Sequence, residues 1–173
     1  MRIHQRLYDN IQIALKDPLD FSSRLVRLNL NHDYPSWRVT KLALSLPKEY
    51  TALEKIASLL PNHPIIPSYP FCCITVNVNV ATWGHRDSKD LILCKVIPVG
   101  TFTGGELVLW EPGLVVELPL GSDIVFPSWK ITHFNLDYVG EQASLVLHTD
   151  KEMARWVGDR NGWADNLTLQ TYA

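Results

Sequence analysis

Thr75-Val76-Asn77-Val78-Asn79-Val80 is the stretch that decides the fold class, because apolar and polar residues alternate strictly along it. A period of two predicts a half-buried β-strand, with valines on one face and asparagines on the other. Asparagine is disfavoured in strands. Two of them on one face therefore either hydrogen-bond neighbouring strands or orient a bound molecule.

Downstream of this strand, which we expect over 71–80, short apolar runs alternate with turn residues. Strands this short, separated by turns about every 8–12 residues, indicate a sandwich or a barrel. Pro98 and Gly100 are expected to end the first of the downstream strands, and Thr103-Gly104-Gly105 to form a turn. The expected strands are 91–99, 106–110, 114–118, 124–126, 130–136 and 142–148.

Upstream of Pro70 the chain has a different pattern. Apolar residues at helical spacing predict amphipathic helices over 3–15 and 47–60, the second with Pro47 in its first turn. Alternation predicts strands over 24–31 and 37–46. The fold class expected is mainly β with N-terminal helices (α+β).

We expect a single domain over 1–173. Its parts are a helical support over roughly 1–70, a β core over roughly 71–150, and a short C-terminal helix and tail over 151–173.

The composition excludes little but sets defaults. The net charge of -2 gives no electrostatic signature for nucleic acid, although a local basic patch remains compatible with it. Three cysteines, with Cys72 and Cys73 adjacent, do not form a disulfide framework. The N-terminus has no apolar secretory core, and no apolar run reaches membrane-spanning length. We therefore expect an intracellular protein, cytoplasmic or nuclear, with free thiols and no membrane partner.

The chemistry concentrates in residues 83–90, Trp-Gly-His-Arg-Asp-Ser-Lys-Asp. On a strand, His85 and Asp87 would point to the same face and could converge on one ion. His133, in an expected strand further along, could supply a third ligand. Two histidines and one carboxylate are the arrangement that holds non-haem Fe(II) with open positions. The alternative for an isolated His-x-Asp is a surface turn, and His148 is expected to be structural.

The motifs from Val76 to Asp150 resemble those of the Fe(II)- and 2-oxoglutarate-dependent dioxygenases. The resemblance is to the branch of TET/JBP-like oxygenases widespread in mushrooms. It covers under half of the chain, with the motifs in the family's order. The shared segments are 76–79, 85–90, 102–107 (Phe-Thr-Gly-Gly-Glu-Leu), 121–126 (Gly-Ser-Asp-Ile-Val-Phe), His133 and 140–146 (Gly-Glu-Gln-Ala-Ser-Leu-Val).

The resemblance implies a double-stranded β-helix, or jelly-roll, as the core fold. It implies His85, Asp87 and His133 as Fe(II) ligands, with 2-oxoglutarate and O2 as cosubstrates. The reaction implied is the oxidation of a C–H bond, for example by hydroxylation. The substrate would be a small molecule or a nucleobase.

One position departs from the family. An arginine in an Arg-x-Ser pair usually binds the far carboxylate of 2-oxoglutarate, and here the matching residues are Gln142-Ala143-Ser144. Glutamine can donate hydrogen bonds but supplies no positive charge. A charge-assisted bond contributes roughly 1.5–3 kcal/mol. Either another group neutralises the carboxylate, or the cosubstrate is not 2-oxoglutarate.

Lys95 is the candidate for that other group, because it interrupts an otherwise apolar strand. A buried lysine is costly unless its ammonium meets an acceptor. It either reaches the rim or pairs with a carboxylate such as Glu106 or Glu117, or it replaces the missing arginine. With Lys95, the candidate cosubstrate-binding residues are Gln142, Ser144, Asn77 and Asn79.

Other residues allow only weaker expectations. Arg86 would point away from its neighbours, toward substrate or solvent. Trp83, Trp110 and Trp129 are expected in the core or the pocket wall.

Three functions follow. The first is a 2-oxoglutarate-dependent Fe(II) dioxygenase, and the second an Fe(II)/O2 enzyme that does not use 2-oxoglutarate. The third is a non-catalytic jelly-roll binding module, which the complete set of three ligands argues against.

Overall fold

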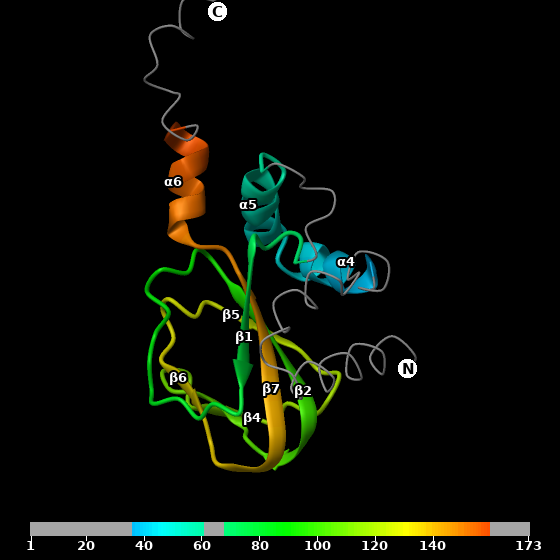
Figure 1. The fold of residues 1–173 in the computed structure, drawn as a ribbon. Coiled ribbons are helices and arrows are strands. Elements are labelled where there is room, and N and C mark those ends of the chain that lie inside the picture. Colours follow the sequence, from blue (N-terminus) through cyan, green and yellow to red (C-terminus); the bar gives the residue numbers. More distant parts are fainter. Residues whose placement is uncertain (1–35, 61–67, 160–173) are drawn as a thin grey trace, which may run out of the picture.

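Antiparallel β-sheets with a few helices make up the part of the chain that the computed structural model describes, residues 36–60 and 68–159 (Figure 1). The expectation of a mainly β fold with N-terminal helices is confirmed for these residues. The helix over 3–15 and the strand over 24–31 lie outside them. No helix in the described ranges is long and apolar enough to span a membrane.

The strands form two sheets in which every pairing is antiparallel. The larger sheet has the order β1-β7-β2-β5, and the smaller one the order β4-β3-β6. Their bounds are β1 Cys73–Val78, β2 Cys94–Gly104, β3 Leu107–Leu109, β4 Leu114–Val116, β5 Ile124–Phe126, β6 His133–Asn135 and β7 Tyr138–His148.

Alternation along the two long central strands gives the larger sheet two different faces. On one face, residues such as Ile97, Val99, Leu145 and Leu147 are buried in a cluster with Leu42 and Leu53. The last two come from helices α4 (Ser36–Ser45) and α5 (Pro47–Ala57), which therefore cover this face. We call it the helix-covered face. The opposite face is turned toward the smaller sheet.

A second apolar cluster lies between the two sheets. It contains Cys94, Leu107, Leu109 and Phe126, all at most 4% exposed. Polar side chains line the rest of the space between the sheets, and the candidate site lies there.

The expectation of a strand over 37–46 is wrong, because Ser36–Ser45 is helix α4. In a strand, Leu42, Leu44 and Leu46 would share one face. In the structure Leu42 is 7% exposed and Leu44 is 78% exposed, while Leu46 packs with Leu42 against the core. A spacing of four residues places side chains on one side of a helix. The sequence allows both a strand period and a helix period here, and burial of Leu42 and Leu46 against the sheet selects the helix.

Strand β2 continues through the two residues expected to end it. At Pro98, β2 pairs with β7 only, since β5 reaches no further than Val96. Proline is tolerated at such an open edge because no partner needs its N–H group. Gly100 has φ +128, and a Cβ there would lie 2.2 Å from the Glu141 carbonyl oxygen. Only glycine fits this close approach of two backbones.

The turn expected at Thr103-Gly104-Gly105 is wrong, because β2 extends through Gly104. The remaining expected strands and helices in the described ranges are present, most of them with shifted ends. Helix α5 begins at Pro47, with Glu49 in its first turn, as expected. Helix α6 covers Lys151–Asp159. The three cysteines are free.

Candidate metal centre and adjoining pocket

His85 and Asp87 lie in a loop between β1 and β2 and not in a regular strand. A single antiparallel bridge joins this loop to β6, with His85 N–H donating to the His133 carbonyl and His133 N–H to the His85 carbonyl. Asp87 N–H donates to the Ser128 carbonyl. These bonds bring two distant segments side by side at the residues that carry the candidate ligands.

The three side chains converge on one point. One ligand atom from each of His85, Asp87 and His133 lies within 4.8 Å of the other two. Asp87 is central, with Oδ1 3.6 Å from His85 Nε2 and Oδ2 3.4 Å from His133 Nε2. The two imidazole rings lie with their centroids 4.5 Å apart. Sequence spacing therefore identified a real cluster.

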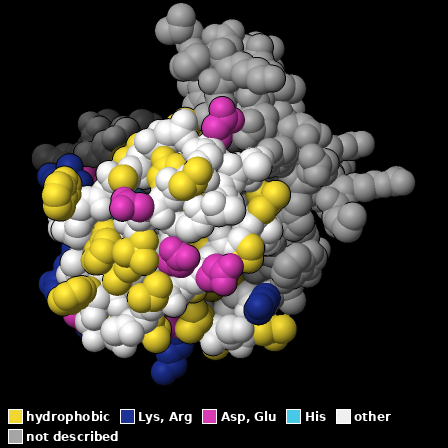
Figure 2. Space-filling model, turned by 90° about the horizontal axis from the view of Figure 1, so that it is seen from below, with side chains coloured by type: hydrophobic (Ala, Val, Ile, Leu, Met, Phe, Trp, Pro, Cys, Tyr) yellow, Lys and Arg dark blue, Asp and Glu magenta, His cyan; other side chains and the backbone are white. Residues whose placement is uncertain are grey.

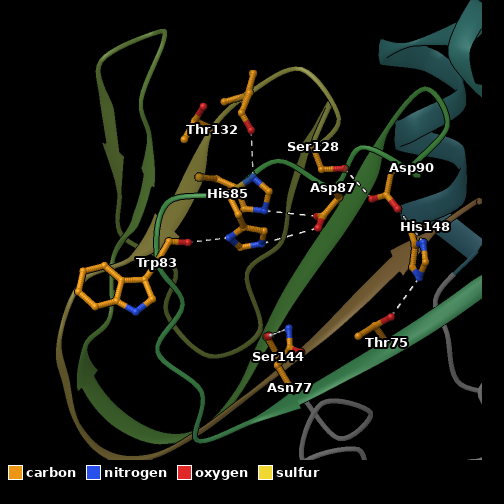
Figure 3. A network of polar contacts seen from close by, with 12 residues as sticks. Thr75, Asn77, Trp83, His85, Asp87, Asp90, Ser128, Thr132, Ser144 and His148 are labelled. Atoms are coloured by element: carbon orange, nitrogen blue, oxygen red, sulfur yellow. Dashed lines mark hydrogen bonds and ion pairs between the residues drawn. The ribbon is translucent and has the colours of Figure 1, made fainter.

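Both imidazoles are held with the same nitrogen facing the cluster (Figure 3). His85 Nδ1 lies 2.8 Å from the Trp83 carbonyl oxygen, and His133 Nδ1 lies 3.0 Å from that of Ile131. A carbonyl only accepts, so Nδ1 carries the proton and donates. The Nε2 lone pair of each ring is thereby left for a metal ion. Such bonds to the second nitrogen are the usual support of metal-binding histidines.

These residues fit a divalent metal ion. Two donors bound about 2.1 Å from one ion, at angles of 90–110°, lie about 3.0–3.4 Å apart. The distance of 3.4 Å from Asp87 to His133 lies within this range, and the distance of 3.6 Å to His85 exceeds it by about 0.2 Å, which a small side-chain rotation can close. Nitrogen donors with a single carboxylate suit iron and similar transition metals better than calcium or magnesium.

Electrostatics couple Asp87 and His133. The hydrogen bond with His133 holds the pKa of the Asp87 carboxyl below its usual value, against the effect of burial. Burial lowers the pKa of His133, but the bonds with Asp87 and the Ile131 carbonyl, with nearby carboxylates, give a net raised pKa. In the imidazolium form of His133 the second proton lies on Nε2, where a metal ion would bind. Metal binding must therefore release it.

A cavity of about 210 Å³ opens beside these three residues, between the two sheets. This is smaller than the roughly 300–1,000 Å³ typical of pockets for drug-sized ligands, so it suits a small molecule. Apolar walls come from Val96, Leu107, Leu118 and Val146. The polar lining outside the cluster is Thr75, Asn77, Thr82, Asp90, Asn135, Gln142, Ser144 and His148.

Three of the expected cosubstrate residues lie in this cavity. Asn77, Gln142 and Ser144 line it from the adjacent strands β1 and β7. Asn77 Nδ2 lies 3.5 Å from Ser144 Oγ, and Gln142 is 7% exposed. Asn79 has a different place: its φ is +49, and its Oδ1 accepts from Gln142 N–H at 3.0 Å. Asn79 thus holds β1 against β7 outside the cavity lining.

The hypothesis that Lys95 replaces the missing arginine is contradicted by its position. Lys95 follows Cys94 and precedes Val96, which both face the cavity, so its own side chain lies on the other face of β2. There its Nζ is 2.9 Å from Asp123 Oδ2, and the ammonium is almost fully buried. It pairs with a carboxylate, but with Asp123 and not with Glu106 or Glu117.

A second polar network adjoins the cluster and was missed in the sequence (Figure 3). Buried Asp90 accepts from Ser128 Oγ at 2.6 Å and lies 2.9 Å from His148 Nδ1. His148 Nε2 lies 3.0 Å from Thr75 Oγ1. The bond to Asp90 raises the pKa of His148, and this outweighs burial. Of these residues, only Asp90 could have been singled out from the sequence, because it belongs to the shared segment 85–90.

The expectation that the tryptophans lie in the core or the pocket wall is wrong for all three, because each is exposed and none lines the cavity. Trp83 is 93% exposed and Trp110 67% exposed, while Trp129, 43% exposed, donates to the Ile92 carbonyl. Arg86 does not face solvent alone, because it pairs with Glu111 and donates to Thr132 Oγ1.

No protein-family model matches the sequence, and no curated protein with which it was compared does so either. Among solved structures, the fold is similar to that of NgTET1 in complex with 5mC DNA, with a TM-score of 0.58 and 17% sequence identity. The likeness covers 77% of this chain and 54% of that one, so this chain spans about half the length of NgTET1. At this identity, the comparison establishes that the two proteins share a β-rich fold.

Proposed function

We propose that the protein is a non-haem Fe(II) oxygenase, with His85, Asp87 and His133 as the metal ligands. The observation that carries the proposal is the convergence of these side chains with both Nε2 atoms left free by Nδ1 bonds to carbonyls. The fold likeness to a TET protein supports it. We further propose that the two sheets form a double-stranded β-helix and that residues 1–173 are one domain.

The side chains have distinct parts in this scheme. Asp87 supplies the negative charge that offsets part of the metal's charge, and the two carbonyl-anchored imidazoles fix the binding direction. An Fe(II) ion held there would activate O2, using the coordination positions that three protein ligands leave open. Val96, Leu107 and Val146 make the cavity wall beside the cluster apolar and help to exclude water.

2-Oxoglutarate is the proposed cosubstrate, and Ser144, Gln142 and Asn77 would hydrogen-bond its far carboxylate. All three line the small cavity next to the metal cluster. Each of them offers a donor without a positive charge, and a hydrogen bond to a charged group contributes roughly 1.5–3 kcal/mol. Several such bonds could together approach the contribution of one arginine.

An Fe(II)/O2 enzyme that does not use 2-oxoglutarate is the alternative. One observation favours it: within the described ranges, no lysine or arginine lines the cavity. The positive charge that the family's arginine would supply at position 142 is therefore not replaced by a lysine or arginine in the cavity lining of the described residues.

The substrate proposed is a small molecule or a nucleobase. The structure of NgTET1 was solved with 5mC DNA, which supports a nucleobase as the substrate. Figure 2 shows a face of this protein on which acidic side chains lie among apolar ones, with lysine and arginine mainly at its edge. A duplex backbone requires basic contacts, so this face would not serve as a duplex-binding surface.

Anaerobic addition of Fe(II) and then 2-oxoglutarate tests the proposal. We expect Fe(II) to bind, and a weak visible charge-transfer band to develop when 2-oxoglutarate is added. Iron binding without the band would favour the alternative cosubstrate. The absence of iron binding would refute the proposed function.

A further inference from the structure

An exposed hydrogen-bonded cluster lies next to all three candidate ligands without containing any of them. Glu111 lies in the turn between β3 and β4 and accepts from three donors. Its Oε2 lies 2.7 Å from the Thr132 backbone nitrogen, and its Oε1 lies 2.7 Å from Thr132 Oγ1 and 2.5 Å from the Arg86 guanidinium. Arg86 Nε also donates to Thr132 Oγ1 at 3.0 Å.

Each of the two residues that donate to Glu111 is adjacent in sequence to a candidate metal ligand. Arg86 is the residue between His85 and Asp87, and Thr132 is the residue before His133. In extended backbone, neighbouring side chains point to opposite sides. The ligands line the cavity while Arg86 and Thr132 do not. Each ligand segment therefore presents ligands inward and a donor outward.

Glu111 bonds to both segments from outside. Backbone bonds join the two segments near the ligands at two places: the pair between His85 and His133, and the bond from Asp87 N–H to the Ser128 carbonyl. These backbone bonds fix the spacing of the two segments.

Bonds from Glu111 to Arg86 and Thr132 add an attachment between side chains on the outer side. We call Glu111 with its bonds to Arg86 and Thr132 the clamp. Thr132 and Arg86 hold the pKa of Glu111 at about 2, so this carboxylate stays ionised at any ordinary pH.

We propose that Glu111 is a positioning residue, which sets the separation of the three metal ligands by holding Arg86 and Thr132 together. This rests on the proposed metal site. Support that orients ligands from outside typically changes metal affinity by 10- to 100-fold. Because Glu111 acts one residue away from the ligands, we expect the lower end of that range.

Anaerobic titration with Co(II), a spectroscopic substitute for Fe(II), tests the proposal. We expect Glu111→Ala to bind Co(II) about 10-fold more weakly than the parent and with a changed visible spectrum. Glu111→Gln keeps an oxygen for the Thr132 backbone and should recover part of the loss. Glu117→Ala removes an exposed carboxylate from the same part of the chain, and should bind as the parent does.

Thermal unfolding of each variant without metal identifies any general loss of fold. If Glu111→Ala does not fold, Arg86→Met is the deciding variant, since it removes one arm of the clamp from an exposed position. An unchanged Co(II) affinity and spectrum in the folded variant would overturn the inference while leaving the metal site intact. A parent protein that binds no Co(II) and no Fe(II) would overturn the metal site itself.

Discussion

The two faces of the larger sheet have different chemistry although they share the same strands. Along β7, Ala143, Leu145 and Leu147 point toward the helices and are at most 3% exposed. The residues that alternate with them, Gln142, Ser144, Val146 and His148, line the cavity. A period of two thus separates a face that stabilises the fold from a face that carries polar groups. Substitutions on the two faces should have separable effects.

The largest effect on stability is expected on the helix-covered face. Leu145→Ala should lower the free energy of unfolding by about 2–5 kcal/mol, because it leaves a cavity in a packed core. Metal affinity, measured well below the unfolding temperature, should not change. Denaturant titration gives the first quantity and anaerobic Co(II) titration the second. Val139→Ala, on an exposed part of the same strand, should cost no more than about 0.5 kcal/mol.

The second-largest effect on stability is expected from the ion pair between Lys95 and Asp123, on the helix-covered face. Lys95→Ala should cost roughly 2–3 kcal/mol, since it leaves the Asp123 carboxylate without its buried partner while that carboxylate stays partly hydrated. Affinity for 2-oxoglutarate should stay unchanged in the metal-loaded variant. Weaker cosubstrate binding would instead restore the role expected from sequence. Lys55→Ala, at an exposed helix position, is the matched control.

On the face that lines the cavity, the contribution of His148 to stability should depend on pH. His148 has a raised pKa in the folded protein because of Asp90, so its protonated form stabilises the fold. This contribution is complete below its unfolded pKa of about 6.5 and is lost as pH rises through the folded value. His148→Gln should therefore lose more stability at pH 6 than at pH 9. Equal losses at both pH values in denaturant titrations would contradict the pairing.

The smallest effect is expected from a single neutral donor in the cavity. Ser144→Ala should weaken binding of 2-oxoglutarate by about 10-fold, the lower end of the range for one hydrogen bond to a charged group. Fe(II) affinity and stability should hardly change. The charge-transfer band at increasing 2-oxoglutarate concentration measures the first quantity. Ser58→Ala, on an exposed helix end, should leave the titration unchanged.

The sequence predicted the β core and the convergence of His85, Asp87 and His133 because both depend on local patterns. Alternation marked the strands, and His-x-Asp with one distant histidine marked the ligands. The strand expected over 37–46 was wrong because the spacing of Leu42 and Leu46 fits both a strand and a helix, and only packing on the sheet chooses between them. Lys95 was misplaced for a related reason. Its burial was predictable, but the face to which it points depends on strand register.

The second network and the clamp could not be predicted. Ser128 and His148 meet Asp90 only after the strands pair, and Glu111 meets Thr132 across two turns. None of these contacts leaves a periodic or local signature in the sequence.

Fe(II) affinity in two histidine variants tests the central claim most directly. His133→Ala removes a proposed ligand, and His148→Gln removes the nearby histidine of the same cavity that is not one. Anaerobic titration should show tight binding by the parent, a loss of more than about 100-fold in His133→Ala, and a change of only a few-fold in His148→Gln. Full affinity in His133→Ala, or an equal loss in both variants, would contradict the assignment of His85, Asp87 and His133 as the metal site.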